Sequence, residues 1–473
     1  MMIDNQALQD LDAILRGMKR AHLAAGPASA ARRRDRLTRA ARLIRDNHGA
    51  IATAIAADFG ARSRYQTLVA DLATTVKMLE HSAEHLESWM QPEPVESPGP
   101  GMSAWIEQQP LGVVGVISPW NFPINLAFGP LAGVFAAGNS AMLKPSELTP
   151  ATSQLLAELV PAYFEPSELC VVLGDASVGA AFSALPFDHL VFTGSTAVGR
   201  HVMRAAAENL VPVTLELGGK SPVVVAEGFD IATAVQRTLT IKSFNAGQIC
   251  LSPDYLLIAE QGQQAFVEAS RAFIASTFPT LQNNPDYTAI INPRHFERLL
   301  GLLDDARRKG ATVISLAPQG EPDFDARTRK IAPHLVFGAS DEMQIMQEEI
   351  FGPLLPVRSC AGFDAALEYI NAHPRPLAAY LFSDDPAQQQ AFARHTTSGA
   401  LVINDVMTHA SIDALPFGGV GASGMGAYHG VHGFRRFTHA KAVVRQSQDG
   451  ASNLRLRAPY DTKLQAIQAF LEA

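Results

Sequence analysis

Two short patterns in the chain contain residue types that could bind a metal ion or a phosphate, and both fall short. His81, Glu84 and His85 follow the spelling HxxEH, which would place two imidazoles on one helical face, as in a zinc peptidase. A five-residue pattern separates true metal sites from chance matches poorly, so we interpret this one as a polar helix face. Gly219-Lys220-Ser221 matches the end of a phosphate-binding P-loop, but that loop needs a glycine where this chain has Thr214. No metal site is therefore predicted.

A glycine-bearing loop between Phe192 and Gly199 has the composition of a nucleotide-binding turn. It follows an apolar segment and opens a predicted helix, although Gly194 and Gly199 lie five residues apart and do not spell GxGxxG. The exposed N–H groups of a helix N-terminus, together with the hydroxyl of Ser195, favour a phosphate there. The loop is a candidate phosphate contact that needs support from elsewhere in the chain.

Three cysteines, Cys170, Cys250 and Cys360, are too far apart for a disulfide framework or a CxxC zinc site. A single cysteine can be a nucleophile, but it is more often a small apolar core residue. Cysteines in this arrangement indicate a reducing compartment, and the N-terminal segment lacks the basic start and apolar run of a secretory signal. We therefore expect a cytoplasmic protein.

The order of strands and helices along the chain determines where the candidate residues lie. The first ninety residues have helical spacing, and a loop rich in proline and glycine follows between Pro92 and Gly101. Apolar and helical segments then alternate, which indicates βαβ units and a mainly parallel, doubly wound sheet. Strands are predicted over 112–117, 141–143, 169–173, 189–192 and 213–217, with helices after Thr149 and over 195–208. Further strands over 223–225 and 255–258 predict a second α/β domain.

The composition excludes several classes of protein. The chain has 473 residues, 47% hydrophobic and 18% charged, which rules out disorder and coiled coils. Its length fits about three folding units, or two large ones with an accessory piece. Its 38 basic and 46 acidic residues give a net charge of −8, which argues against nucleic acid as a partner. The uncharged segment 111–143 is long enough to span a bilayer, but Pro119, Pro123 and Pro130 would break a membrane helix. We predict no membrane span.

Six motifs occur in the order and rough spacing of one family: PWNFP at 119–123, KPSE at 144–147, TGS at 193–195, LELGGK at 215–220, GQIC at 247–250 and EEIFGP at 348–353. Taken together they resemble the aldehyde dehydrogenase superfamily, and the resemblance covers nearly the whole chain. AGQIC leading into SPDY at 252–255, and LPFGGVG at 415–421, are similar to the class 3 branch. Softer matches, such as DFG at 58–60 with RSR at 62–64, resemble bacterial coniferyl aldehyde dehydrogenases.

The resemblance implies an α/β fold with a Rossmann-like dinucleotide-binding domain over 1–216 and a catalytic thiol domain over 217–404. Residues 405–473 would return to the cofactor domain and end in an oligomerisation strand and a tail. A small β oligomerisation element is expected in a hairpin near 105–118 and a strand near 442–446, which implies a homodimer. The spacing of Leu464, Ile467 and Leu471 predicts a packing or dimer-contact helix at the end of the chain.

The catalytic residues implied by the resemblance are Cys250, Glu216 and Asn121. A thiolate at Cys250 would add to an aldehyde carbonyl and give a thiohemiacetal, whose oxyanion can expel hydride toward a nicotinamide and leave a thioester. The amide of Asn121 and the N–H of Cys250 would stabilise that oxyanion. Glu216, with a pKa raised by burial, would activate the water that hydrolyses the thioester.

The cofactor implied is NAD, with NADP also possible. Lys144 and Glu147 correspond to the pair that meets the adenosine ribose, and a carboxylate there favours a free 2′-hydroxyl, while the lysine beside it softens that preference. Class 3 relatives often accept both cofactors. The remaining cofactor contacts implied are Trp120, Gly194, Ser195, Gly199, Leu217, Glu349 and Phe351.

The expected reaction is irreversible oxidation of a small-molecule aldehyde to an acid. Phe122 stands where many class 3 relatives have tyrosine, so the expected tunnel wall is more apolar and suits an aromatic aldehyde such as coniferyl aldehyde, or a medium- or long-chain aliphatic one. His429 either lines the tunnel entrance or caps a loop. Two alternative functions remain. One is a coenzyme A-acylating dehydrogenase, which the presence of Glu216 disfavours, and the other is an inactive binding protein.

Overall fold

Apolar strands with both faces covered build the sheet of the N-terminal half. The computed structural model describes residues 5–96, 99, 101–450 and 452–473, so positions 97, 98 and 100 of the predicted proline-rich loop lie outside the described residues. This sheet is six-stranded, in the order β17-β7-β6-β3-β4-β5, and is parallel except at β17. Its strands are β3 (Val113–Ile117), β4 (Ser140–Lys144), β5 (Leu169–Val171), β6 (His189–Gly194), β7 (Val213–Leu217) and β17 (Gly424–Met425).

Helices cover this sheet on both faces, which is why its strands read as continuous apolar runs. One face carries an apolar core shared with α1 (Asn5–Ala25), α7 (Ala176–Ser183) and α8 (Thr196–Ala207). The buried helix α5 (Asn125–Ala136) packs against β3 and β4. The helices packed around α5 or next to them are α2 (Ala30–Phe59), α3 (Arg64–Gln66), the π-helix η1 (Thr67–Ala73), α4 (Thr74–Trp89), α6 (Pro150–Leu159) and α15 (Gly430–Arg436).

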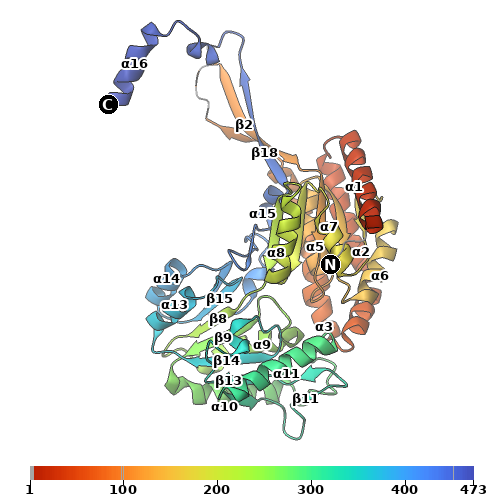
Figure 1. Ribbon diagram of the computed structural model, residues 1–473, viewed down its shortest axis with the longest axis vertical. Helices are drawn as coiled ribbons and strands as arrows, with labels where there is room; N and C mark the ends of the chain where they lie inside the picture. The colour runs from red at the N-terminus through yellow and green to blue at the C-terminus, as the bar shows by residue number, and fades with distance from the viewer. Residues whose placement is uncertain (1–4, 97–98, 100, 451) are drawn as a thin grey trace.

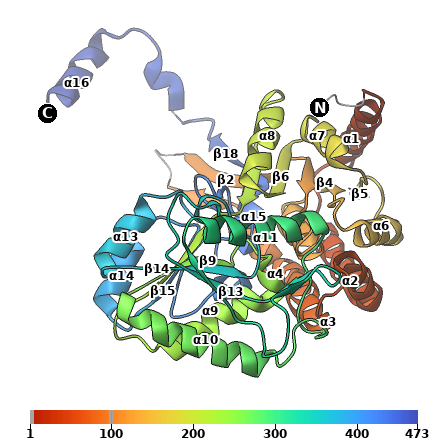
Figure 2. The same cartoon turned by 60° about the horizontal axis from the view of Figure 1, so that its bottom comes forward.

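A second sheet forms the other half of the molecule (Figures 1 and 2). It is seven-stranded, in the order β10-β13-β14-β9-β8-β15-β16, with β10 antiparallel to β13 and the other pairs parallel. The strands are β8 (Ser221–Val225), β9 (Pro253–Ile258), β10 (Thr312–Ser315), β13 (His334–Phe337), β14 (Leu354–Ser359), β15 (Ala378–Phe382) and β16 (Ala400–Ile403). The longer helices around it are α9 (Ile231–Ser243), α10 (Gln263–Thr277), α11 (Pro293–Arg308), α13 (Phe363–Asn371) and α14 (Pro386–His395).

The chain crosses from one sheet to the other within three residues. Strand β7 ends at Leu217, and β8 begins at Ser221 after Gly218, Gly219 and Lys220. The carboxyl ends of the first sheet's parallel strands therefore face the amino ends of strands in the second. Ligands of open α/β sheets bind outside the carboxyl ends of the strands, so this junction is the expected place for a site.

A third sheet projects from the body as an arm. Strand β2 (Met102–Pro110) lies between β1 (Glu93–Val95) and β18 (Thr438–Gln446), and all pairs are antiparallel. Beyond the arm, every residue of α16 (Asp461–Glu472) is exposed, and the helix stands away from the body in both views (Figures 1 and 2). Among the described residues, none of the helices is long and apolar enough to cross a membrane.

The predicted α/β fold is confirmed. Seven of the predicted strands are present within two or three residues of their expected bounds, from β3 to β9, and helices α6 and α8 begin where predicted. The hairpin predicted near 105–118 takes a different form, because Val113–Ile117 is fully buried in the six-stranded sheet as β3. Only Met102–Pro110 of that segment joins the arm, where it pairs with β18 along all nine residues.

Candidate active site

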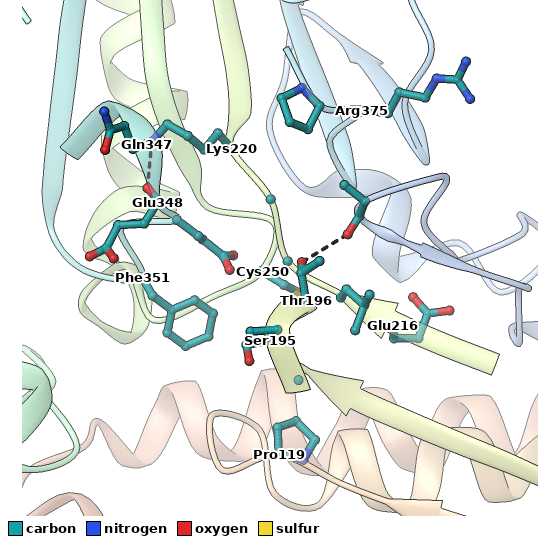
Figure 3. A pocket seen from close by; sticks show the side chains of 18 of the residues that line it. Pro119, Ser195, Thr196, Glu216, Lys220, Cys250, Gln347, Glu348, Phe351 and Arg375 are labelled. Carbon is teal, nitrogen blue, oxygen red and sulfur yellow. Dashed lines mark hydrogen bonds between the residues drawn. The ribbon is translucent and has the colours of Figure 1, made fainter. Parts of the chain in front are cut away.

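A cavity of about 810 Å³ lies where the two sheets meet (Figure 3). Residues from both sheets line it, including the β7–β8 crossover and the segments that precede β9 and β14. The predicted site residues that line this cavity are Trp120, Asn121, Gly194, Ser195, Glu216, Leu217, Cys250, Glu349 and Phe351. Their positions span more than two hundred residues of sequence, so the fold brings them together.

Three predicted cofactor residues do not line the cavity. Lys144 is buried at the end of β4, and its Nζ forms an ion pair with Glu147 Oε2 at 2.8 Å. Gly199 lies in the second turn of α8, where an added Cβ would meet the side chain of Leu217 at 2.7 Å. Its lack of a side chain lets α8 pack closely on the end of β7.

Cys250 lies in a turn between η3 (Phe244–Gly247) and β9. The backbone before it is strained, because Asn245 and Ala246 have φ angles of 50° and 51°. Hydrogen bonds hold this conformation: Asn245 N donates to Gln66 Oε1 at 3.0 Å, and Asn245 Nδ2 donates to the carbonyl oxygen of Gln248 at 3.1 Å. The thiol is thus carried by a loop whose shape its buried neighbours determine.

The surroundings of the Cys250 thiol favour its neutral form. Burial and then the negative charges of Glu349 and Glu216 raise its pKa to about 12, while the main-chain N–H groups of Cys250 and Leu251 act in the opposite direction. A thiolate here needs positive charge or a proton acceptor close by. The carboxyl of Glu216 is close enough to influence the thiol electrostatically.

Asn121 is tied to the same loop. It follows β3, and its side-chain Nδ2 donates to the carbonyl oxygen of Gln248 at 3.2 Å. Its own carbonyl oxygen accepts from Arg62 Nη1 at 2.6 Å and from Asn245 Nδ2 at 3.3 Å. The amide expected to bind the oxyanion is therefore fixed relative to the residues that precede the thiol.

Glu216 is a buried carboxyl without a hydrogen-bond partner among the described residues. It lies in β7, in register with Gly424 of β17. Burial raises its pKa well above the usual value, and the charge of Arg436 lowers it only in part. A carboxyl with a raised pKa and free oxygen atoms can take a proton from water, which is what a general base requires.

The cofactor side of the cavity has the features that a dinucleotide needs. Ser195 caps α8, and the N-terminal residues of that twelve-residue helix line the cavity, which suits a pyrophosphate. Glu349 Oε1 is buried without a partner among the residues described, and burial raises the pKa of this carboxyl to about 8. The rings of Phe351 and Trp120 lie edge to face at 5.4 Å. The residues present therefore fit NAD(P).

Lys220 is a site residue that sequence reasoning missed. The sequence indicated it only as the end of an incomplete P-loop and of the LELGGK motif. In the structure its Nζ donates to the carbonyl oxygen of Glu348 at 3.0 Å (Figure 3). It also donates to the carbonyl oxygen of Ile345 at 2.8 Å and forms an ion pair with Asp254. These bonds connect the β7–β8 crossover to the segment that carries Glu349 and fix their relative position. The signals in the sequence were its position directly after two glycines at a strand end and its place as the last residue of the LELGGK motif.

The histidines that the sequence analysis singled out do not line the cavity. The rings of His81 and His85, on α4, lie 4.2 Å apart at a tilt of 34°, and no cluster of three or more metal-binding side chains occurs in the described part of the chain. His429 precedes α15 but makes no capping hydrogen bond with its side chain. Its ring instead stacks on Phe417 at 4.7 Å.

Comparison with known proteins agrees with this geometry. The sequence model of the "Aldehyde dehydrogenase family" matches residues 2–443. A protein named "Coniferyl aldehyde dehydrogenase" from Pseudomonas sp. is 57% identical over 98% of this chain and 96% of its own length. A second relative, from Caulobacter vibrioides, is named "Probable coniferyl aldehyde dehydrogenase" and is 52% identical over 94% of this chain and 93% of its own.

The fold has similar neighbours among solved structures. The substrate-bound AldH of Staphylococcus aureus superposes with a TM-score of 0.90 at 34% identity, with 100% of each chain covered. The match of the family model to almost the whole chain, together with relatives of this identity and coverage, shows the family directly. The chain belongs to the aldehyde dehydrogenase family, whose members oxidise aldehydes with NAD(P).

Proposed function

We propose that this enzyme oxidises a coniferyl-type aromatic aldehyde to the corresponding acid through a thioester on Cys250. The observation that carries the proposal is one cavity that contains a thiol, a fixed amide and a buried, unpaired carboxyl, supplied by Cys250, Asn121 and Glu216. These three groups match the three requirements of the reaction: a nucleophile, a donor for the developing oxyanion and a base for hydrolysis.

In the first half-reaction the Cys250 thiol loses its proton to solvent, the thiolate sulfur adds to the carbonyl carbon, and the electron pair of the C=O bond moves to the oxygen, which becomes an oxyanion. Asn121 Nδ2 and the N–H of Cys250 are the donors that we assign to it. NAD(P), when bound, supplies the acceptor for the hydride that this oxyanion expels. The carbon is thereby oxidised to a thioester, and Cys250 stays acylated.

In the second half-reaction Glu216 takes a proton from water as the water oxygen attacks the thioester carbon. The C–S bond then breaks, the acid leaves and the thiolate of Cys250 is regenerated. A raised pKa serves this step, because a carboxylate with an ordinary pKa of about 4.3 is too weak a base at neutral pH. Coenzyme A is not needed as an acceptor when this base is present.

The aromatic substrate class is supported by the two relatives named for coniferyl aldehyde. Phe122, which the sequence predicted on the tunnel wall, is 8% exposed and does not line the cavity, so it gives no support to this assignment. A panel of coniferyl-type and medium-chain aliphatic aldehydes, ranked by kcat/KM, tests this assignment. We expect the aromatic aldehydes to rank first by at least about tenfold, which corresponds to about 1.4 kcal/mol of binding in the transition state. A higher kcat/KM for aliphatic or short polar aldehydes would overturn it.

We further infer that the enzyme is a cytoplasmic homodimer. Three free cysteines suit a reducing compartment, and the arm presents strand β18 as an exposed edge, in which Val444 is 61% exposed. We assign cofactor binding to the domain over 1–216 and the catalytic thiol to the domain over 217–404. The segment 405–473 returns to the cofactor domain and supplies the arm strand and the tail.

A further inference from the structure

A charged pair is buried behind the oxyanion site. Arg62, between α2 and α3, and Asp71, in the π-helix η1, both have side chains that are 0% exposed, and Arg62 Nη2 lies 3.8 Å from Asp71 Oδ2. Removing two charges from water is costly, and a buried pair often adds no stability over apolar residues of the same size. A π-helical turn at the same place is a further feature that is frequent at functional sites.

The hydrogen bonds of this pair go to the segment that carries Asn121. Arg62 Nη1 donates to the carbonyl oxygen of Asn121 at 2.6 Å. Asp71 Oδ1 accepts from the N–H groups of Ile124 at 3.0 Å and Asn125 at 2.6 Å, at the start of α5, where Ile124 offers no capping side chain. The pair therefore holds both ends of the 121–125 segment, one through a cation and the other through an anion.

The guanidinium also contacts two aromatic rings beside this segment. Its carbon lies 5.0 Å from the centre of the Phe122 ring and 4.6 Å from that of Phe59, which is the arrangement of a desolvated cation–π contact on two rings. Phe122 follows Asn121 directly in the chain. One side chain thus contacts both the main chain of Asn121 and the ring of the next residue.

The pair is poorly suited to a purely stabilising role. Arg62 Nε and Nη2 and Asp71 Oδ2 are buried without a hydrogen-bond partner among the residues that the structure describes. A half-satisfied buried network is worse for stability than an apolar core. The contacts that are made are concentrated on the 121–125 segment, so the position of that segment is what the pair determines.

We propose that Arg62, supported by Asp71, is a positioning residue that fixes the Asn121 amide for the oxyanion of the thiohemiacetal. Arg62 acts through the Asn121 carbonyl, which is also bonded to Asn245, and Asn121 Nδ2 in turn bonds the Gln248 carbonyl, two residues before the thiol. The inference rests on the proposed function, because it needs Asn121 to act in the step that reduces the cofactor.

Arg33 offers a matched control. It is another buried arginine, 3% exposed, and it too bonds main-chain carbonyls: Ala28 O at 2.8 Å and Ala136 O at 3.0 Å. Ala136 is the last residue of α5, at the end far from Asn121. Arg33→Met therefore removes the same kind of buried side chain, from α2 and at the far end of α5, without touching the oxyanion site.

The experiment is a double-mutant cycle on the rate of the NADH burst in the full-length enzyme, with coniferyl aldehyde as substrate. Asn121→Ala should slow the burst on the order of 100-fold, and Arg62→Met about tenfold or more, with KM for NAD little changed. The double variant should be no slower than Asn121→Ala alone, because Arg62 acts only through that amide. Arg33→Met should leave the burst rate unchanged and add nothing to Asn121→Ala.

The outcomes separate the inference from the proposed function. If Asn121→Ala leaves the burst unchanged, the proposed oxyanion role is wrong, and the positioning role with it. If Asn121→Ala slows the burst but Arg62→Met does not, or slows it equally in the presence and absence of Asn121, only the inference is wrong. Should Arg62→Met fail to fold, Arg62→Lys replaces it in the cycle; it keeps the charge and one donor, and we expect a smaller loss that again disappears in the Asn121→Ala background.

Discussion

At the scale of residues, one cavity contains three ionisable groups whose burial favours their neutral forms. Burial raises the pKa of Cys250, Glu216 and Glu349, and the negative charges of the two carboxyls add to the effect on the thiol. The thiol must therefore lose its proton before it can attack an aldehyde.

The nucleophile is tested by Cys250→Ala. This variant should lose turnover completely, because it has no sulfur to form the thiohemiacetal, while NAD binding followed by fluorescence should stay within about twofold of wild type. Cys360→Ala, at a half-buried cysteine outside the cavity, is the control. Full activity of Cys250→Ala would refute the assignment.

The base is tested by Glu216→Gln, which keeps the shape of the side chain and removes its basicity. The variant should release one equivalent of NADH in a burst and then turn over at least about a hundredfold more slowly, because the thioester is not hydrolysed. In the wild type the steady rate should rise with pH as the carboxyl ionises, since its pKa is raised. Equal steady rates in wild type and variant would contradict the role.

Glu349 gives a prediction about stability and pH. Its pKa is raised from 4.5 to about 8, first by burial and then by Asp254, so the folded state keeps a proton that the unfolded state releases. Stability is therefore lost as pH rises between these two values. Glu349→Gln should remove that loss, so the Tm of the variant minus the Tm of the wild type should increase from pH 5 to pH 8.

The matched control for Glu349 is its neighbour Glu348, whose side chain is 49% exposed and pairs with Arg298. Glu348→Gln should show no such gain over the same pH range. Parallel Tm curves for wild type and Glu349→Gln would show that this carboxyl is ionised in the folded enzyme.

At the scale of elements, the β7–β8 crossover sets the distance between the two halves of the site. An added Cβ at Gly218 would overlap the carboxylate of Glu349, whereas one at Gly219 would meet Pro376 Cα at 3.4 Å, an ordinary contact. Gly218→Ala should raise KM for NAD about tenfold, the loss expected for one displaced hydrogen bond of the Glu349 carboxyl. Gly219→Ala should change it little, and equal effects of the two would contradict this account of the crossover.

The strands of this site could be predicted from the sequence, because apolar runs and helix caps are local patterns. The βαβ alternation located β6, α8 and β7, and the motifs located Cys250 and Glu216. The long-range hydrogen bonds that hold the site together could not be predicted. Lys220 bonds carbonyls more than a hundred residues away, and Arg62 bonds Asn121 across 59 residues, so their roles exist only once the chain has folded.

At the scale of the whole molecule, the arm and the terminal helix α16 lie outside the body that contains the site (Figure 1). Apolar side chains of α16, such as Phe470 at 74% exposed, are typical of a surface that another chain covers. The sequence predicted the helix and the arm strand from their spacing and from the resemblance.

The proposed homodimer is tested on the arm. Val444→Asp puts a charge on the exposed strand β18 and should shift the enzyme from dimer to monomer in size-exclusion chromatography with light scattering. Leu210→Asp, at a residue 90% exposed just beyond α8, is the control and should stay dimeric. A monomeric wild type, or a dimer that Val444→Asp leaves intact, would contradict this use of the arm.

The central claim is that substrate carbon becomes covalently bound to Cys250 in the course of oxidation. The most direct measurement is mass spectrometry of Glu216→Gln quenched after mixing with NAD and coniferyl aldehyde, followed by peptide mapping. The account predicts an acyl group, two hydrogens poorer than the thiohemiacetal, on the peptide that contains Cys250 and on neither Cys170 nor Cys360. NADH formation without any adduct on Cys250 would contradict it.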